Sequence, residues 1–185
     1  IPAFPTDADI CLARGLILDE LFVDFPFISE TERAHAVALL LLFFVRPMIP
    51  GLTPLHLVEK PSPGTGASLL IEVIAKVATG DAALTMTEGR SEEEWRKRIT
   101  AVLYRGPSMI FIDNVRRCLD SAALSTAITA TIWTDRILGR SEIVHVPVRS
   151  IWVATGNNPV VSHEIGRRTI RIRLDAKRDR PWMRQ

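Results

Sequence analysis

The stretch from Lys60 to Leu70 constrains the fold more than any other part of the chain. It reads Lys-Pro-Ser-Pro-Gly-Thr-Gly-Ala-Ser-Leu-Leu and separates an apolar run at 55–59 from a segment with helical apolar spacing at 68–78. Glycines let the backbone curl so that successive N–H groups face one anion, and the helix that follows adds the positive end of its dipole. The stretch therefore predicts a strand, an anion-binding turn and a helix in succession.

The turn matches the phosphate-binding pattern G-x-x-x-x-G-K-[ST] only in part. Pro61 stands at the first glycine position and Ala67 at the lysine position. We expect Ser68 to offer its hydroxyl to Mg²⁺, and the alternative is a role as the helix N-cap. Lys60 is a candidate substitute cation, whereas Lys76 lies two turns into the helix and points away. The residues predicted to bind phosphate are Lys60, Pro63, Gly64, Thr65, Gly66, Ala67, Ser68 and Leu69.

Composition and cysteine usage indicate an ordinary globular chain. Its 185 residues are 47% hydrophobic and 24% charged, which suits one α/β domain. No apolar run approaches the ~20 residues of a membrane-spanning helix. Cys11 and Cys118 form no C-x-x-C unit, and the four histidines are scattered. We therefore expect a reduced cytoplasmic protein without structural zinc, although a long-range disulfide stays open.

Apolar runs alternate with amphipathic segments along the chain. Strands are expected at 55–59, 83–86, 108–113, 151–154 and 169–174, and helices at 8–21, 30–45, 68–78, 91–104, 121–133 and 163–167. Residues 142–148 are expected to form half of a hairpin whose turn involves Gly139. This alternation predicts a three-layer α/β/α fold with a mainly parallel five-stranded sheet.

The domain organisation follows from the same pattern. We expect a helical N-terminal extension at 1–52, a core at 53–176 and a basic C-terminal tail at 177–185. The helix at 30–45 is expected to pack on the core. It is also a candidate for one wall of the pocket that holds the adenine base of a nucleotide.

Polar side chains follow three of the predicted strands. The first strand ends in the glycine turn, the third in Asp113-Asn114 and the fourth in Asn157-Asn158. Because ligands gather outside the carboxyl ends of parallel strands, these groups should converge at one sheet edge. The alternatives are a strand-end capping role for Asp113 and ordinary turn chemistry for the Asn pair.

This order resembles the core of AAA+ P-loop ATPases over residues 55–175, where Walker A, Walker B, sensor 1 and an arginine finger follow one another. Residues 134–168 resemble more closely the helicase- or primase-associated ATPases of phages and integrative mobile elements. The resemblance implies ATP and Mg²⁺ as cofactors. It also implies a small helical lid after the core, which we expect to be absent because the chain ends shortly after the fifth strand.

The resemblance assigns roles to individual residues. Asp113 corresponds to the metal-side Walker B residue, and Asn114 stands where the catalytic Glu is usual; an amide orients water but cannot accept its proton. Asn157 or Asn158 corresponds to sensor 1. Arg167 and Arg168 correspond to a finger that reaches a neighbouring subunit's nucleotide, the alternative being a surface salt bridge.

The charge distribution and the expected hairpin near 136–149 indicate a nucleic acid as a binding partner. Residues 166–185 carry eight basic and two acidic side chains, hence +6, which leaves −4 for the other 165 residues. In a homo-oligomeric ring, the hairpin at about 136–149 would contact single-stranded DNA through Arg140 or Arg149. A hairpin that covers the sheet and a solvated C-terminal tail are the alternatives.

Three functions follow from these residues. The first is the ATP-binding core of a DNA replication protein of helicase type, with ATP-driven DNA translocation as its expected activity, and Asn157, Arg167 and Arg168 favour it. The second is a non-hydrolysing nucleotide-binding or scaffold module, which Ala67 and Asn114 favour. The third is an AAA+ regulator that acts on other proteins.

Overall fold

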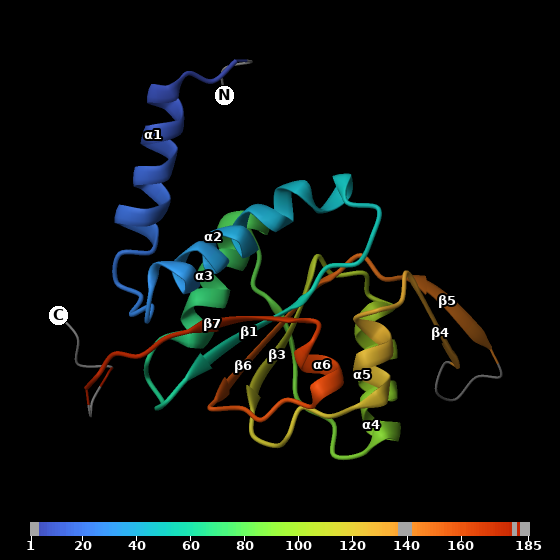
Figure 1. Cartoon of the computed structure of the whole chain (residues 1–185). Coiled ribbons are helices and arrows are strands. Elements are labelled where there is room, and N and C mark those ends of the chain that lie inside the picture. Colours follow the sequence, from blue (N-terminus) through green and yellow to red (C-terminus); the bar gives the residue numbers. More distant parts are fainter. Residues whose placement is uncertain (1–3, 137–141, 179–180, 182–185) are drawn as a thin grey trace.

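The five predicted strands form a single parallel sheet in the computed structural model, which describes residues 4–136, 142–178 and 181 (Figure 1). The strand order is β2-β3-β6-β1-β7. A separate antiparallel hairpin pairs β4 with β5. The strands are β1 (Leu55–Lys60), β2 (Leu84–Met86), β3 (Met109–Val115), β4 (Ile132–Arg136), β5 (Ile143–Pro147), β6 (Ile151–Asn157) and β7 (Thr169–Arg173).

Helices precede the sheet and connect its strands. The N-terminal part contains α1 (Asp7–Gly15), the π-helix η1 (Leu16–Leu21), α2 (Glu30–Val45) and the short 3-10 helix η2 (Arg46–Met48). The connecting helices are α3 (Ala67–Thr79), α4 (Glu92–Leu103), α5 (Ala122–Ala127) and α6 (His163–Gly166). Serine N-caps begin α2, α4, α5 and α6, as the sequence predicts for the first two.

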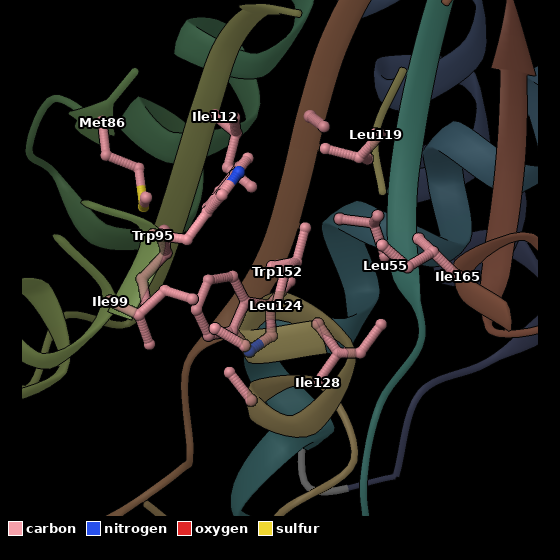
Figure 2. Packing of buried hydrophobic residues seen from close by; sticks show 14 of the residues in the cluster. Leu55, Met86, Trp95, Ile99, Ile112, Leu119, Leu124, Ile128, Trp152 and Ile165 are labelled. Atoms are coloured by element: carbon pink, nitrogen blue, oxygen red, sulfur yellow. The ribbon is translucent and has the colours of Figure 1, made fainter. Parts of the chain in front are cut away.

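Two hydrophobic clusters cover the two faces of the sheet, because successive strand residues point to opposite sides. One cluster joins α4, α5 and α6 to the face that carries Leu57 and Trp152. The other joins α2 and α3 to the face that carries Val58 and Val153. Figure 2 shows Trp152 of β6 beside Leu124 of α5. The predicted three-layer α/β/α fold is therefore confirmed.

The predicted helix at 121–133 is wrong in its second half. It ends at Ala127, and Ile132–Arg136 forms strand β4 instead. This segment is rich in β-branched and aromatic residues, which favour strands. Trp133 is buried against α4, where its Nε1 donates a hydrogen bond to Thr100 Oγ1 at 2.9 Å. The tertiary contact therefore decides the conformation.

Helix α2 is joined to the sheet by a buried acid. Glu32, only 2% exposed, accepts hydrogen bonds from Ser29 and from the guanidinium of Arg173 on β7. Burial alone would raise the pKa of Glu32, but these bonds outweigh it and lower the pKa. Among the described residues, no helix is long and apolar enough to cross a membrane.

Candidate functional site

The glycine turn connects β1 to α3 at the carboxyl edge of the sheet. Gly64 and Gly66 have φ angles of 79° and 102°, a region that non-glycine residues rarely adopt. Thr65 is buried and its Oγ1 donates a hydrogen bond to Ser62 O at 2.7 Å. Gly66 is the N-cap of α3 and provides no side-chain cap. The first N–H groups of α3 therefore remain available to an anion, as in phosphate-binding loops.

Ser68 turns its hydroxyl to β3 rather than to the start of its own helix. Its Oγ donates a hydrogen bond to Asp113 Oδ1 at 2.9 Å. Because Gly66 is the N-cap, the alternative role of Ser68 as N-cap is wrong. Asp113 in turn accepts no backbone N–H bond among the described residues, which argues against a capping role. A hydroxyl beside a half-buried carboxylate is a donor set that suits Mg²⁺.

Thr155 completes this cluster, and the sequence analysis did not single it out. Its Oγ1 donates to Asp113 Oδ1 at 2.7 Å and accepts the N–H of Asn114 at 2.9 Å. Among the described residues, Asp113 Oδ2 makes no hydrogen bond and stays available to a cation. The sequence did contain one indication of this role. Thr155 lies two residues before Asn157, so both side chains lie on the same face of β6.

The two asparagines at the end of β6 differ in their surroundings. Asn157 is the last strand residue, lies opposite Lys60 in the register and is exposed. Asn158 has a φ of 45°, and its N–H donates to Lys60 O at 3.0 Å. Asn158 therefore serves the turn, whereas Asn157 presents its side chain on the face that carries Ser68 and Asp113.

Two backbone irregularities lie beside Asp113. The β3–β6 pairing shifts register between Ile112 and Val115, and Asn114 has a φ of 57°. Asn tolerates this left-handed conformation better than most residues, which gives a local reason for Asn at position 114. A Cβ on Gly156 would lie 2.8 Å from Pro159 Cβ and 3.0 Å from Val115 O. The strand end therefore packs closely against the irregular part of β3.

Comparison with known proteins identifies the architecture. No family model and no curated protein matches the chain. A solved structure of JCV helicase with a bound thiazolopyridinyl phenoxyphenyl acetamide matches 90% of this chain and 52% of its own, with a TM-score of 0.51 and 10% identity. A second structure of JCV helicase has a TM-score of 0.47 and 11% identity, covering 90% of this chain and 51% of that one. The chain thus spans about half the length of these helicase chains.

The chain has a P-loop NTPase fold, which it shares with the first of these JCV helicase structures. In this fold, the glycine turn, Ser68, Asp113 and Asn157 share the carboxyl edge of the sheet, so the structure brings together four of the groups that the sequence singled out. At this identity the likeness concerns the fold alone.

Arg167 and Arg168 lie at the other end of the sheet. They immediately precede β7, and Arg168 O accepts the N–H of Leu55 at the start of β1. Arg168 Nη1 also binds Ser125 Oγ at 3.2 Å and Glu164 Oε1 at 3.1 Å. Arg167 is exposed, and among the described residues its side chain makes no hydrogen bond or ion pair, although its N–H donates to His163 O at 3.2 Å. Neither arginine reaches the glycine turn of its own chain.

The β4–β5 hairpin is held on α4 by a polar network. Asp135 accepts hydrogen bonds from Thr100 Oγ1 at 2.7 Å and from Arg96 Nη2 at 2.6 Å. Burial raises the pKa of Asp135, but these bonds outweigh it and lower the pKa. Arg149 follows β5 and is exposed, whereas Arg140 and Gly139 lie outside the described residues.

The basic C-terminal region is partly neutralised within the chain. Arg171 lies 3.2 Å from Glu59 Oε1, and Arg173 pairs with Glu32. Burial raises the pKa of Glu59, and the nearby Arg171 and Arg173 oppose this rise. Lys76 Nζ donates to Gly80 O at the end of α3, which agrees with its predicted direction away from the phosphate turn. Cys11 and Cys118 are both free and exposed.

Proposed function

We propose that this chain is the ATP- and Mg²⁺-binding core of a helicase-type motor. The motor works in the cytoplasm as a ring on single-stranded DNA during replication of a phage or another mobile element. The observation that carries the proposal is the hydrogen bond from Ser68 Oγ to Asp113 Oδ1 at the start of α3, a helix whose N-cap residue provides no side-chain cap. The helicase fold of the chain supports it.

The proposed site divides the work between backbone and side chains. The N–H groups of the turn and of the first turn of α3 bind the phosphates, and Ser68 and Asp113 would hold Mg²⁺. Mg²⁺ held there would supply positive charge against the charge that develops on the transferred phosphoryl group. Asn157 and Asn114 orient the attacking water through their amides. Neither side chain can accept the proton of that water, so their role is limited to orientation. The side-chain cation normally provided by lysine is absent at Ala67, so we expect slow turnover.

Single-stranded DNA should stimulate phosphate release from ATP. We expect slow steady-state release by the chain, raised by DNA, and loss of both rates in Asp113→Asn because the metal ligand is removed. Asp120→Asn removes an exposed carboxylate from the loop that follows β3 and should leave both rates unchanged. Absence of turnover at millimolar ATP by an assembled, nucleotide-bound oligomer would instead support the scaffold function, which Ala67 and Asn114 favour.

Arg167, rather than Arg168, is the proposed finger in trans. The Arg167→Ala variant should lower the rate of phosphate release by about 100-fold or more while ATP affinity stays unchanged, because the guanidinium acts on the transition state. Arg168→Ala should instead lower the free energy of unfolding by about 1 kcal/mol, because it loses its bonds to Ser125 and Glu164. Phosphate-release kinetics and urea unfolding, each carried out on both variants, measure the two effects. Equal release rates in Arg167→Ala and the parent would exclude the assignment.

A further inference from the structure

Helix α1 forms an arm with its apolar side chains in solvent. Figure 1 shows it extending away from the sheet, and none of its residues is buried. Ile10 and Leu12 are 50% and 66% exposed, and Leu16, where η1 begins, is 49% exposed. Only the base of the arm packs on the core, through Ile17 and Leu21. Residues 7–21, called the arm from here on, thus carry an uncovered apolar surface.

The exposed part of the arm, α1, is too short to be stable as a helix by itself. Thr6 and Asp9 form a capping box at its start, but helices of fewer than ~12–15 residues are marginal in water without packing. The nine residues of α1 therefore need a surface that covers Leu12 and its neighbours.

A second apolar surface lies at the far end of α2. It consists of four apolar residues that are spaced three, one and three positions apart and therefore lie on one helical face: Leu41, Phe44, Val45 and Met48. Their exposed fractions are 48%, 59%, 42% and 79%, respectively. We call these four residues the α2 patch. Exposed apolar residues in such continuity mark an interaction surface.

One chain cannot use its own arm to cover its own α2 patch. The arm precedes the start of α2 at Glu30, whereas the patch begins at Leu41, ~17 Å along this helix at 1.5 Å per residue. Figure 1 shows α1 rising at a steep angle from the start of α2 rather than lying along it. Within the part of the chain that the structure describes, the arm therefore does not cover the patch, and a second copy can supply the partner of each surface.

The charges of the two surfaces are complementary. Residues 7–24 carry five acidic side chains and one arginine, hence −4. From Arg33 to Val58 the sequence has no acidic residue. Arg33 lies in the first turn of α2 and pairs with Glu30, so Arg46, between Val45 and Met48, is the fixed charge beside the α2 patch. Opposite charge around two apolar surfaces favours their encounter and suppresses contact between two arms.

We propose that the arm of one copy packs on the α2 patch of a second copy of this chain. The two surfaces are different, so the contact is heterologous and repeats from subunit to subunit until it closes into a ring. This inference rests on the assembly part of the proposed function and names the surfaces that carry it.

A mixture of two variants tests this contact by sedimentation velocity. Leu12→Glu damages only the arm and Phe44→Glu only the α2 patch, so each alone should be monomeric at concentrations where the parent assembles. Loss of a buried leucine contact should weaken association at least ~10-fold. Mixed in equal amounts, the variants share one intact contact, and they should form a dimer of about 41 kDa, twice the 20.6 kDa of one chain, and no larger species.

The controls separate this inference from folding and from nucleotide binding. Tyr104 is 65% exposed and belongs neither to the arm nor to the α2 patch. The Tyr104→Glu variant should therefore assemble like the parent. Circular dichroism checks the fold of each variant, and ATP binding by the monomeric variants tests the nucleotide site independently. A parent that stays monomeric at 100 μM or more, or a Phe44→Glu variant that assembles like the parent, would overturn the inference.

Discussion

The Ala67→Lys variant is expected to bind ATP about 10 to 150 times more tightly than an Ala67→Met variant. Position 67 is the first residue of α3, directly after the glycine turn. A hydrogen bond that involves a charged group contributes ~1.5–3 kcal/mol, and each ~1.4 kcal/mol is a factor of ten in affinity. Isothermal titration with ATP and Mg²⁺ measures the difference.

Methionine is the matched control because Ala67 is buried, at 1% exposure. Both substitutions add a long side chain and so disturb the packing of α3 similarly, but only lysine adds a charge. Thermal unfolding of both variants establishes that they are folded. If the two variants bind ATP equally, the missing lysine does not limit this site, and another cation, with Lys60 as the candidate, supplies the charge.

The chain is expected to lose stability as the pH falls from about 6.5 to about 4, because His56 is buried in the neutral form. Burial, together with nearby His35, lowers the pKa of His56 to about 4 from its ordinary value of 6.5, and outweighs backbone hydrogen bonds with Trp152 and Pro54 that raise it. The side chain is 2% exposed and its Nδ1 has no hydrogen-bond partner among the described residues.

The sign follows from proton binding. The unfolded chain protonates this imidazole below pH 6.5, whereas the folded chain resists until about pH 4, so acid favours unfolding. At pH 5 the expected loss from this residue is about 2 kcal/mol. Urea unfolding at pH 7.5 and pH 5.0 should therefore show a smaller pH effect, by this amount, in His56→Gln than in the parent.

His163→Gln serves as the control because that imidazole is exposed at the start of α6. It should retain the pH dependence of the parent. If His56→Gln also retains it, the imidazole is protonated in the folded chain and the buried site admits the charge.

Local sequence patterns predicted most elements because their signals do not depend on distant residues. The serine cap at Ser29 and the apolar spacing of 30–45 predict α2 with the bounds that it has. The prediction failed at 121–133, where Trp133 gains more from burial against α4 than from continuing the helix. No local pattern contains that contact, since Thr100 lies more than thirty residues away.

The candidate site divides in the same way. The sequence singled out Ser68, Asp113 and Asn157 because each follows or ends a strand in a recognisable pattern. It did not single out Thr155, because a threonine inside an apolar strand has no distinctive pattern. Its role as a bridge between Asp113 and the backbone of Asn114 depends on the neighbouring strand.

Spacing along the chain was enough to predict the five strands of the sheet, the glycine turn and the polar residues at the strand ends, because these features are local. The packing of remote segments decided which hydroxyls contact Asp113, that Arg168 is engaged within its own chain while Arg167 is exposed, and that the arm stands away from the core. These are distances between segments remote in sequence, and they are fixed by how the strands align in the sheet and how the helices pack on it.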